Sequence, residues 1–93
     1  MASEELVRLW EKIEGDLLRA RGVLPAGVAD DSLVKDFHEY LDHNELELAC
    51  DMLEASAEEH SPPHLFWEAL RDAALNMNLH GRAQRYAAMA GRP

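Results

Sequence analysis

The sequence has few of the features that mark secreted proteins and membrane proteins. It contains a single cysteine, Cys50, in 93 residues, so an intrachain disulfide framework is excluded and a reducing compartment is expected. No apolar run approaches the ~20 residues that a transmembrane helix needs. The first residues, Met1 to Glu5, lack the basic stretch and following apolar stretch that define a signal peptide. We therefore expect a cytoplasmic protein that does not enter a membrane.

Motifs for catalysis and for cofactor binding are also lacking. Five histidines are present, but His60 and His64 are separated by Ser61-Pro62-Pro63, which breaks the helix that would align them. The sequence contains no HExxH motif, no CxxC motif and no glycine-rich loop for phosphate. We expect no catalytic residue, no metal and no cofactor, hence no enzyme. A small enzyme or metal protein stays open as the least favoured alternative.

Alternating strand patterns are absent, whereas every long segment has apolar residues at helical spacing. The chain is long enough for one core, and 47% of its residues are hydrophobic. The prediction is an all-α fold, a compact bundle of four to five short helices in a single helical domain over residues 1–93. The helices are expected at about residues 3–21, 32–41, 44–59, 61–77 and 82–90. Short loops favour antiparallel neighbours.

Polar residues before these segments predict how the helices begin. Ser3 is expected to cap the first helix, Asp30 or Asp31 the second, and Asn44 the third, with Glu47 completing a capping box. Ser61, before two prolines, is expected to cap the fourth. Cys50 is expected to be buried and inert, and Trp67, which is off the apolar stripe, to be partly exposed. The expected core consists of Leu6, Trp10, Ile13, Leu17, Phe37, Leu41, Leu46, Ala49, Leu53, Phe66, Leu70 and Tyr86.

Basic residues are almost absent from the middle third of the chain. Residues 30–59 contain eleven acidic residues and one basic residue, Lys35, so their net charge of −10 slightly exceeds the −9 of the whole chain. Such a field repels nucleic acid and anionic membranes, and it accelerates encounter with a basic protein. We therefore expect a basic protein partner, with no binding to nucleic acid or to a membrane.

Four carboxylates of the helix expected at 44–59, those of Glu47, Asp51, Glu54 and Glu58, fall within about 60° of one another. This acidic ridge has no base on its own helix, so its members are expected to repel one another. Apolar residues border the ridge. The alternatives without a partner are that the acidic face is only solvated and that these apolar residues pack on another helix. The candidate partner-binding residues are Asp36, Glu39, Asp42, Glu45, Glu47, Leu48, Asp51, Met52, Glu54 and Glu58.

The run Phe-His-Glu-Tyr-Leu-Asp-His-Asn-Glu-Leu-Glu-Leu-Ala at residues 37–49 resembles the core of small bacterial immunity proteins of the MafI type. The resemblance extends over about residues 36–60. It implies a protein that binds and neutralises a polymorphic toxin encoded beside it. The expected function is therefore that of an immunity protein. The alternative is a small helical interaction module with another partner, with a homodimer through Leu48 and Met52 as one form.

Overall fold

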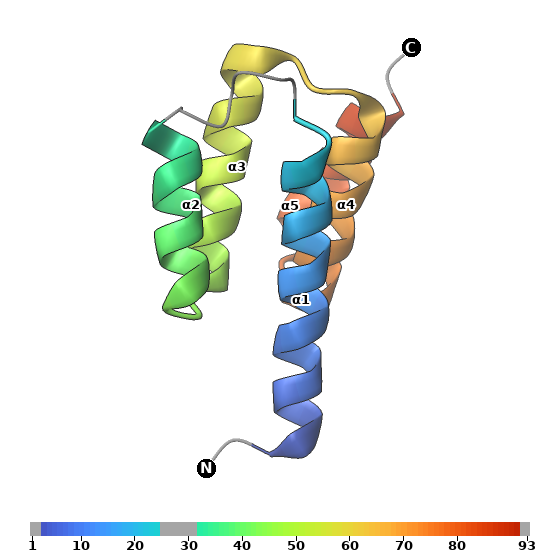
Figure 1. Cartoon of the computed structure of the whole chain (residues 1–93). Coiled ribbons are helices and arrows are strands. Elements are labelled where there is room, and N and C mark those ends of the chain that lie inside the picture. The colour runs from blue at the N-terminus through green and yellow to red at the C-terminus, as the bar shows by residue number, and fades with distance from the viewer. Residues whose placement is uncertain (1–2, 25–31, 92–93) are drawn as a thin grey trace.

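Five α-helices make up the fold in the computed structural model, which describes residues 3–24 and 32–91 except for the side chains of residues 59 and 60. They are α1 (Glu4–Gly22), α2 (Ser32–Asp42), α3 (Leu46–His60), α4 (His64–Asn76) and α5 (His80–Ala90), shown in Figure 1. The described residues contain no strand. The predicted all-α bundle of short helices is confirmed, with five helices. Within the described residues, no helix is both long enough and apolar enough to cross a membrane.

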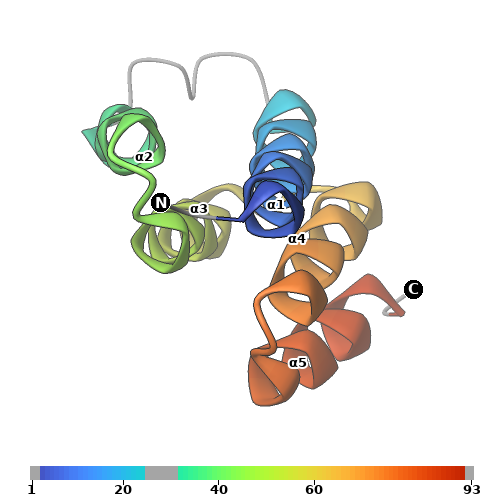
Figure 2. The same cartoon turned by 90° about the horizontal axis from the view of Figure 1, so that it is seen from below.

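The helices are arranged as two hairpins and one longer helix. α2 packs against α3, and α4 packs against α5, while α1 lies along α4 and touches α3 more lightly (Figures 1 and 2). The assembly is flattened, with principal extents of 41 × 28 × 17 Å. The N-terminal half of α1 extends past the ends of the other helices in Figure 1. α4 therefore has neighbours on two sides, whereas α2 packs chiefly on α3.

Both hairpins turn at an asparagine with a left-handed backbone. In the first corner, residues 43–45, Asn44 has φ 56°, its N–H donates to the Leu41 carbonyl (3.0 Å), and the Glu45 N–H donates to the Tyr40 carbonyl (2.8 Å). This pair of bonds is a Schellman motif, which satisfies the last carbonyls of α2. Asn44 therefore ends α2 instead of capping α3, whose N-cap is Glu45 without a side-chain hydrogen bond, so the predicted capping box is wrong.

The second corner, residues 77–79, repeats this geometry. Asn78 has φ 60°, its N–H donates to the Leu75 carbonyl (3.1 Å), and the Leu79 N–H donates to the Ala74 carbonyl (2.9 Å). Asparagine suits both positions because it tolerates the left-handed region better than other residues with a Cβ. The two corners thus have the same backbone conformation and the same pair of hydrogen bonds.

The other predicted caps have mixed outcomes. Ser3 caps α1, because its Oγ accepts from the Leu6 N–H at 3.1 Å. Ser61 instead ends α3 with φ 43°, and Pro63 is the N-cap of α4. A residue that precedes a proline avoids the α region, so Pro62 cannot begin a helix before Pro63 and α4 starts at His64. Asp30 and Asp31 lie outside the described residues.

The buried hydrophobic residues form one cluster to which all five helices contribute. Ten of the twelve predicted core residues are buried, Trp10 is only partly buried, and Leu6 remains 38% exposed. Leu6 is on the predicted stripe, but the neighbouring helices end before they reach it. Cys50 is buried as predicted.

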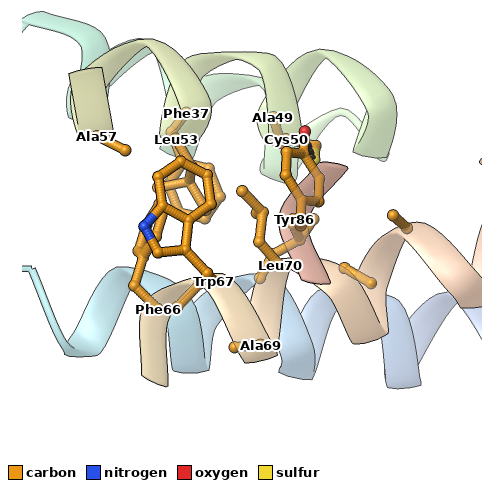
Figure 3. Packing of buried hydrophobic residues seen from close by; sticks show 14 of the residues in the cluster. Phe37, Ala49, Cys50, Leu53, Ala57, Phe66, Trp67, Ala69, Leu70 and Tyr86 are labelled. Atoms are coloured by element: carbon orange, nitrogen blue, oxygen red, sulfur yellow. Dashed lines mark hydrogen bonds between the residues drawn. The ribbon is translucent and has the colours of Figure 1, made fainter. Parts of the chain in front are cut away.

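Trp67 corrects the expectation that it is partly exposed, since only 7% of it is accessible. Its ring meets Phe66 edge-on at 5.0 Å and lies 5.8 Å from the Tyr86 ring (Figure 3). Because α4 packs on α1 and on α5, residues on two of its faces are buried, and a single apolar stripe does not describe it.

A buried polar contact also joins α1 to α4. Asp16 is buried, accepts a hydrogen bond from Asn76 Nδ2 at 3.0 Å, and lies 3.3 Å from the Arg19 guanidinium. Arg19 in turn pairs with Asp72 of α4 at 2.9 Å. These partners compensate for the burial of the Asp16 carboxylate.

Candidate protein-binding surface

The acidic ridge of α3 faces α5, which supplies the bases that α3 lacks. Arg82 pairs with Asp51 and lies 3.7 Å from Glu47, while Arg85 pairs with Glu54 at 2.6 Å. The expectation of unrelieved repulsion along the ridge is therefore wrong. Three of its four carboxylates help to hold the two hairpins together.

The positive charge of Arg82, which an arginine keeps at any ordinary pH, is stabilised by its partner. Partial burial of the guanidinium by itself lowers its pKa, but the close contact with the negatively charged Asp51 outweighs burial and raises the pKa above its ordinary value. Arg82 thus stays charged at the contact between α3 and α5, where 24% of its side chain is exposed. Neutralising Asp51 would leave this cation without its main partner.

Glu54 is held from two directions. Besides Arg85, it accepts a hydrogen bond of 2.6 Å from the Tyr86 hydroxyl, which lies 3.6 Å from Cys50 Sγ. Figure 3 shows the side chains of Cys50 and Tyr86 meeting between α3 and α5. Burial raises the pKa of both groups, so the thiol and the phenol are protonated at neutral pH. The arrangement suits packing and hydrogen bonding, and it does not activate the thiol as a nucleophile.

A second group of the predicted residues lies on or beside the α2–α3 hairpin without ion-pair partners. Asp36, Glu39, Asp42, Glu45 and Glu58 are all exposed, and none forms an ion pair with another described residue. The first three project from α2, Glu45 is in the first corner, and Glu58 is near the end of α3. These carboxylates carry the charge that remains available to a partner.

The two predicted apolar residues differ from each other. Leu48 is 42% exposed, whereas Met52 is partly buried and packs against the core. The structure therefore divides the ten candidate residues into groups with different surroundings instead of assembling them into one patch. Glu47, Asp51 and Glu54 face α5, and the unpaired carboxylates lie mainly along α2.

A pocket of about 590 Å³, which we call the α3–α4 pocket, lies where α3 ends and α4 begins, with the end of α5 beside it. Its buried lining is apolar and aromatic, and exposed polar side chains stand at its mouth. Ridge residue Glu58 is one of these. The lining residues are Glu54, Ala57, Glu58, Ser61, Pro62, Pro63, His64, Trp67, Arg85, Tyr86 and Met89.

Most of this lining was not among the candidate residues from the sequence. Pro62 and Pro63 indicate a helix boundary in the sequence, and only the structure shows that they form one wall of a pocket. The available signal was Trp67, a large aromatic residue off the main stripe of its helix. In the described part of the chain, no group of three or more His, Cys, Asp or Glu residues could hold a metal ion. No protein-family model, curated protein or solved structure matches the chain at a significant level.

Proposed function

We propose that this chain is a non-enzymatic protein-binding domain that binds a basic partner protein through its α2–α3 hairpin. The resemblance at residues 37–49 makes a bacterial toxin domain the candidate partner, neutralised by binding in the cytoplasm. The charge supports a basic partner, since residues 32–60 contain nine acidic residues and a single lysine. Charge complementarity of this kind accelerates association and excludes acidic competitors.

The observation that carries the proposal is the α3–α4 pocket beside an unpaired carboxylate. A lysine or arginine of the partner can lay its aliphatic stem over Trp67 and Met89 while its charged head reaches Glu58. A site with an aromatic wall and an adjacent carboxylate selects for this combination of apolar stem and cation. The pocket therefore supplies an anchor for a partner that the acidic surface attracts.

The carboxylates of α2 have a different role in this proposal. Asp36, Glu39 and Asp42 are exposed and unpaired within the described residues, so they act on an approaching partner through their long-range field. Their neutralisation should slow association and reduce its dependence on salt. The Glu58 contact should act mainly after docking, on the rate of dissociation.

The test is binding kinetics against a candidate toxin domain, for which the choice is a basic C-terminal domain of a large secreted protein if the neighbouring gene encodes one. We expect the double variant D36N/E39Q to slow association about three- to ten-fold at low salt. The matched control is E11Q/E14Q, which removes two exposed acids from α1 and should change association less than two-fold. Equal effects of the two variants would mean that net charge alone matters and would contradict a binding surface on α2.

The pocket is tested separately with a charge reversal at an exposed position. E58K should increase the dissociation rate of the complex at least ten-fold, since it places a cation where the partner's cation binds. E11K, the same change on α1, is the control for altered net charge. If E58K dissociates no faster than E11K, the pocket is not the anchor.

A further inference from the structure

The N-terminal half of α1, residues 3–12, has an apolar face that no other helix covers fully. Leu6 is 38% and Val7 39% exposed, and Leu9 and Trp10 are only partly buried. Figure 1 shows the reason, since this half of α1 runs beyond both hairpins. The helical period of the sequence continues through it, so the segment has a packing face without a packing neighbour.

A groove of about 340 Å³, which we call the corner groove, begins where α1 leaves the body of the molecule. Both hairpin corners meet α1 there, and the apolar side chains that line it come from α1, α3 and the second corner. They are Leu9, Trp10, Ile13, Leu46, Met77 and Leu79. The polar residues Asn44, Glu47, Asn76 and Asn78 complete the lining. The apolar part of the groove continues onto the free half of α1 through Leu9 and Trp10.

The charges along this segment are nearly balanced, in contrast to the strongly acidic residues 30–59. Residues 3–12 contain three acidic and two basic residues, among which Arg8 already pairs with Glu4 at 3.1 Å. Glu5 and Lys12 are seven positions apart, so they lie about 20° apart on the same flank of the helix. This flank therefore presents one negative and one positive end beside the apolar stripe.

We propose that this surface binds a second copy of the chain, with the two α1 helices antiparallel about a two-fold axis. In the register centred between Val7 and Arg8, Leu6 packs on Leu9 of the partner subunit and enters the mouth of its corner groove. Two-fold symmetry repeats the contact with the roles exchanged. In this register, residues 3–12 of the two copies lie alongside each other over their full length.

The charge pattern identifies the occupant. Antiparallel helices bring equivalent flanks together, so this register sets Glu5 near Lys12 of the partner subunit, and Lys12 near the partner subunit's Glu5. Elsewhere the surface of one copy repels another, because the chain carries a net charge of −9. The proposal goes beyond binding of a basic protein and does not depend on it.

Self-association should be weak and concentration-dependent. Two ten-residue helical segments bury less than the ~1,600 Å² of a standard interface, so we expect a Kd of roughly 10–100 µM. Sedimentation equilibrium of the full chain should show the mass rising from 10.5 kDa toward twice that value as concentration increases. A chain that is monomeric throughout the range from about 5 µM to 1 mM would overturn the proposal.

Single substitutions locate the surface. L6E should weaken self-association at least ten-fold, and its circular dichroism spectrum should be unchanged because Leu6 is exposed. L65E is the matched control, since Leu65 is also exposed but lies on α4. Dimers that survive L6E, or that are lost equally in L65E, would mean that another surface associates.

A charge exchange tests the register itself. E5K and K12E should each weaken the dimer several-fold, because each places like charges opposite one another in both symmetric contacts. The double variant E5K/K12E should restore the wild-type Kd within about two-fold, since it recreates both ion pairs with reversed sign. Failure of the double variant to recover would exclude the antiparallel arrangement.

Discussion

The two helical hairpins of this molecule turn with the same backbone conformation but differ in the charged residues on their helices. Each turns through a three-residue corner with a left-handed asparagine, Asn44 in α2–α3 and Asn78 in α4–α5. Residues 32–60 contain nine acidic residues and one lysine, whereas residues 64–90 contain two acidic residues and three arginines. The geometry of the turn is therefore independent of the charge on the helices that it joins.

Charge instead determines how the two hairpins contact each other and which carboxylates remain available to a partner protein. Arg82 and Arg85 of α5 bind three carboxylates of α3, and the carboxylates of α2 keep no partner among the described residues. The hairpins also differ in their neighbours, because α4 lies against both α1 and α5 while α2 packs chiefly on α3. The two hairpins contribute equally to the buried core, with eight hydrophobic residues each, whereas the α2–α3 hairpin presents most of the surface charge.

The largest effect is expected where the two hairpins meet at Tyr86. Tyr86→Ala should lower the free energy of unfolding by about 3–5 kcal/mol, because it empties a fully buried site and removes the hydrogen bond to Glu54. Urea denaturation measures this change. Tyr86→Phe, which keeps the ring, should cost only about 1 kcal/mol. Equal losses in the two variants would place the stabilisation in the hydroxyl and not in packing.

A smaller loss is expected from the ion pairs between α3 and α5. Arg82→Met should lower the free energy of unfolding by about 1–2 kcal/mol, since its side chain is largely covered and Asp51 loses its partner. The control is Arg8→Met on α1. Arg8 pairs with Glu4, and their side chains are 74% and 82% exposed, so this substitution should lower the free energy of unfolding by under about 0.5 kcal/mol.

A double-mutant cycle distinguishes the pair from general charge effects. The double variant D51N/R82M should lose less free energy of unfolding than the sum of the two single variants. Each single substitution leaves the other charge without its partner, and the double variant removes both charges. Strict additivity, measured by urea denaturation, would contradict a direct interaction between the hairpins at this point.

Alkaline pH should weaken the contact between α3 and α5 at Cys50 and Tyr86. Burial raises the pKa values of Cys50 and Tyr86 above their ordinary 9.0 and 10.0, so the unfolded chain releases these protons at lower pH than the folded chain. Stability is therefore full below pH 9 and falls as pH rises, with a loss of about 1 kcal/mol from Tyr86 at pH 11. Urea denaturation between pH 7 and 11 measures it, and Tyr86→Phe should flatten the upper part of the profile.

The sequence predicted the helices well because their apolar periods are long and uninterrupted, as in α1 and α3. It failed at Asn44 and Ser61, since a polar residue between two helices serves equally as the end of one or the cap of the next. Helical period alone could not reveal that α5 arginines face the acidic ridge, because that contact depends on packing between distant segments. For the same reason the α3–α4 pocket was not predicted, although Glu58 was already a candidate.

The smallest expected effect is the difference between the two corners. Asn44→Ala and Asn78→Ala should each cost about 1 kcal/mol, since alanine in the left-handed region is strained while the Schellman hydrogen bonds remain. Because the backbone geometry is shared, we expect the two costs to agree within about 0.5 kcal/mol in urea denaturation. Glycine at either position should leave stability within about 0.5 kcal/mol of the wild type, as it accepts this conformation freely. A markedly larger cost at Asn78 would show that the surrounding core, and not the turn alone, determines what a corner contributes.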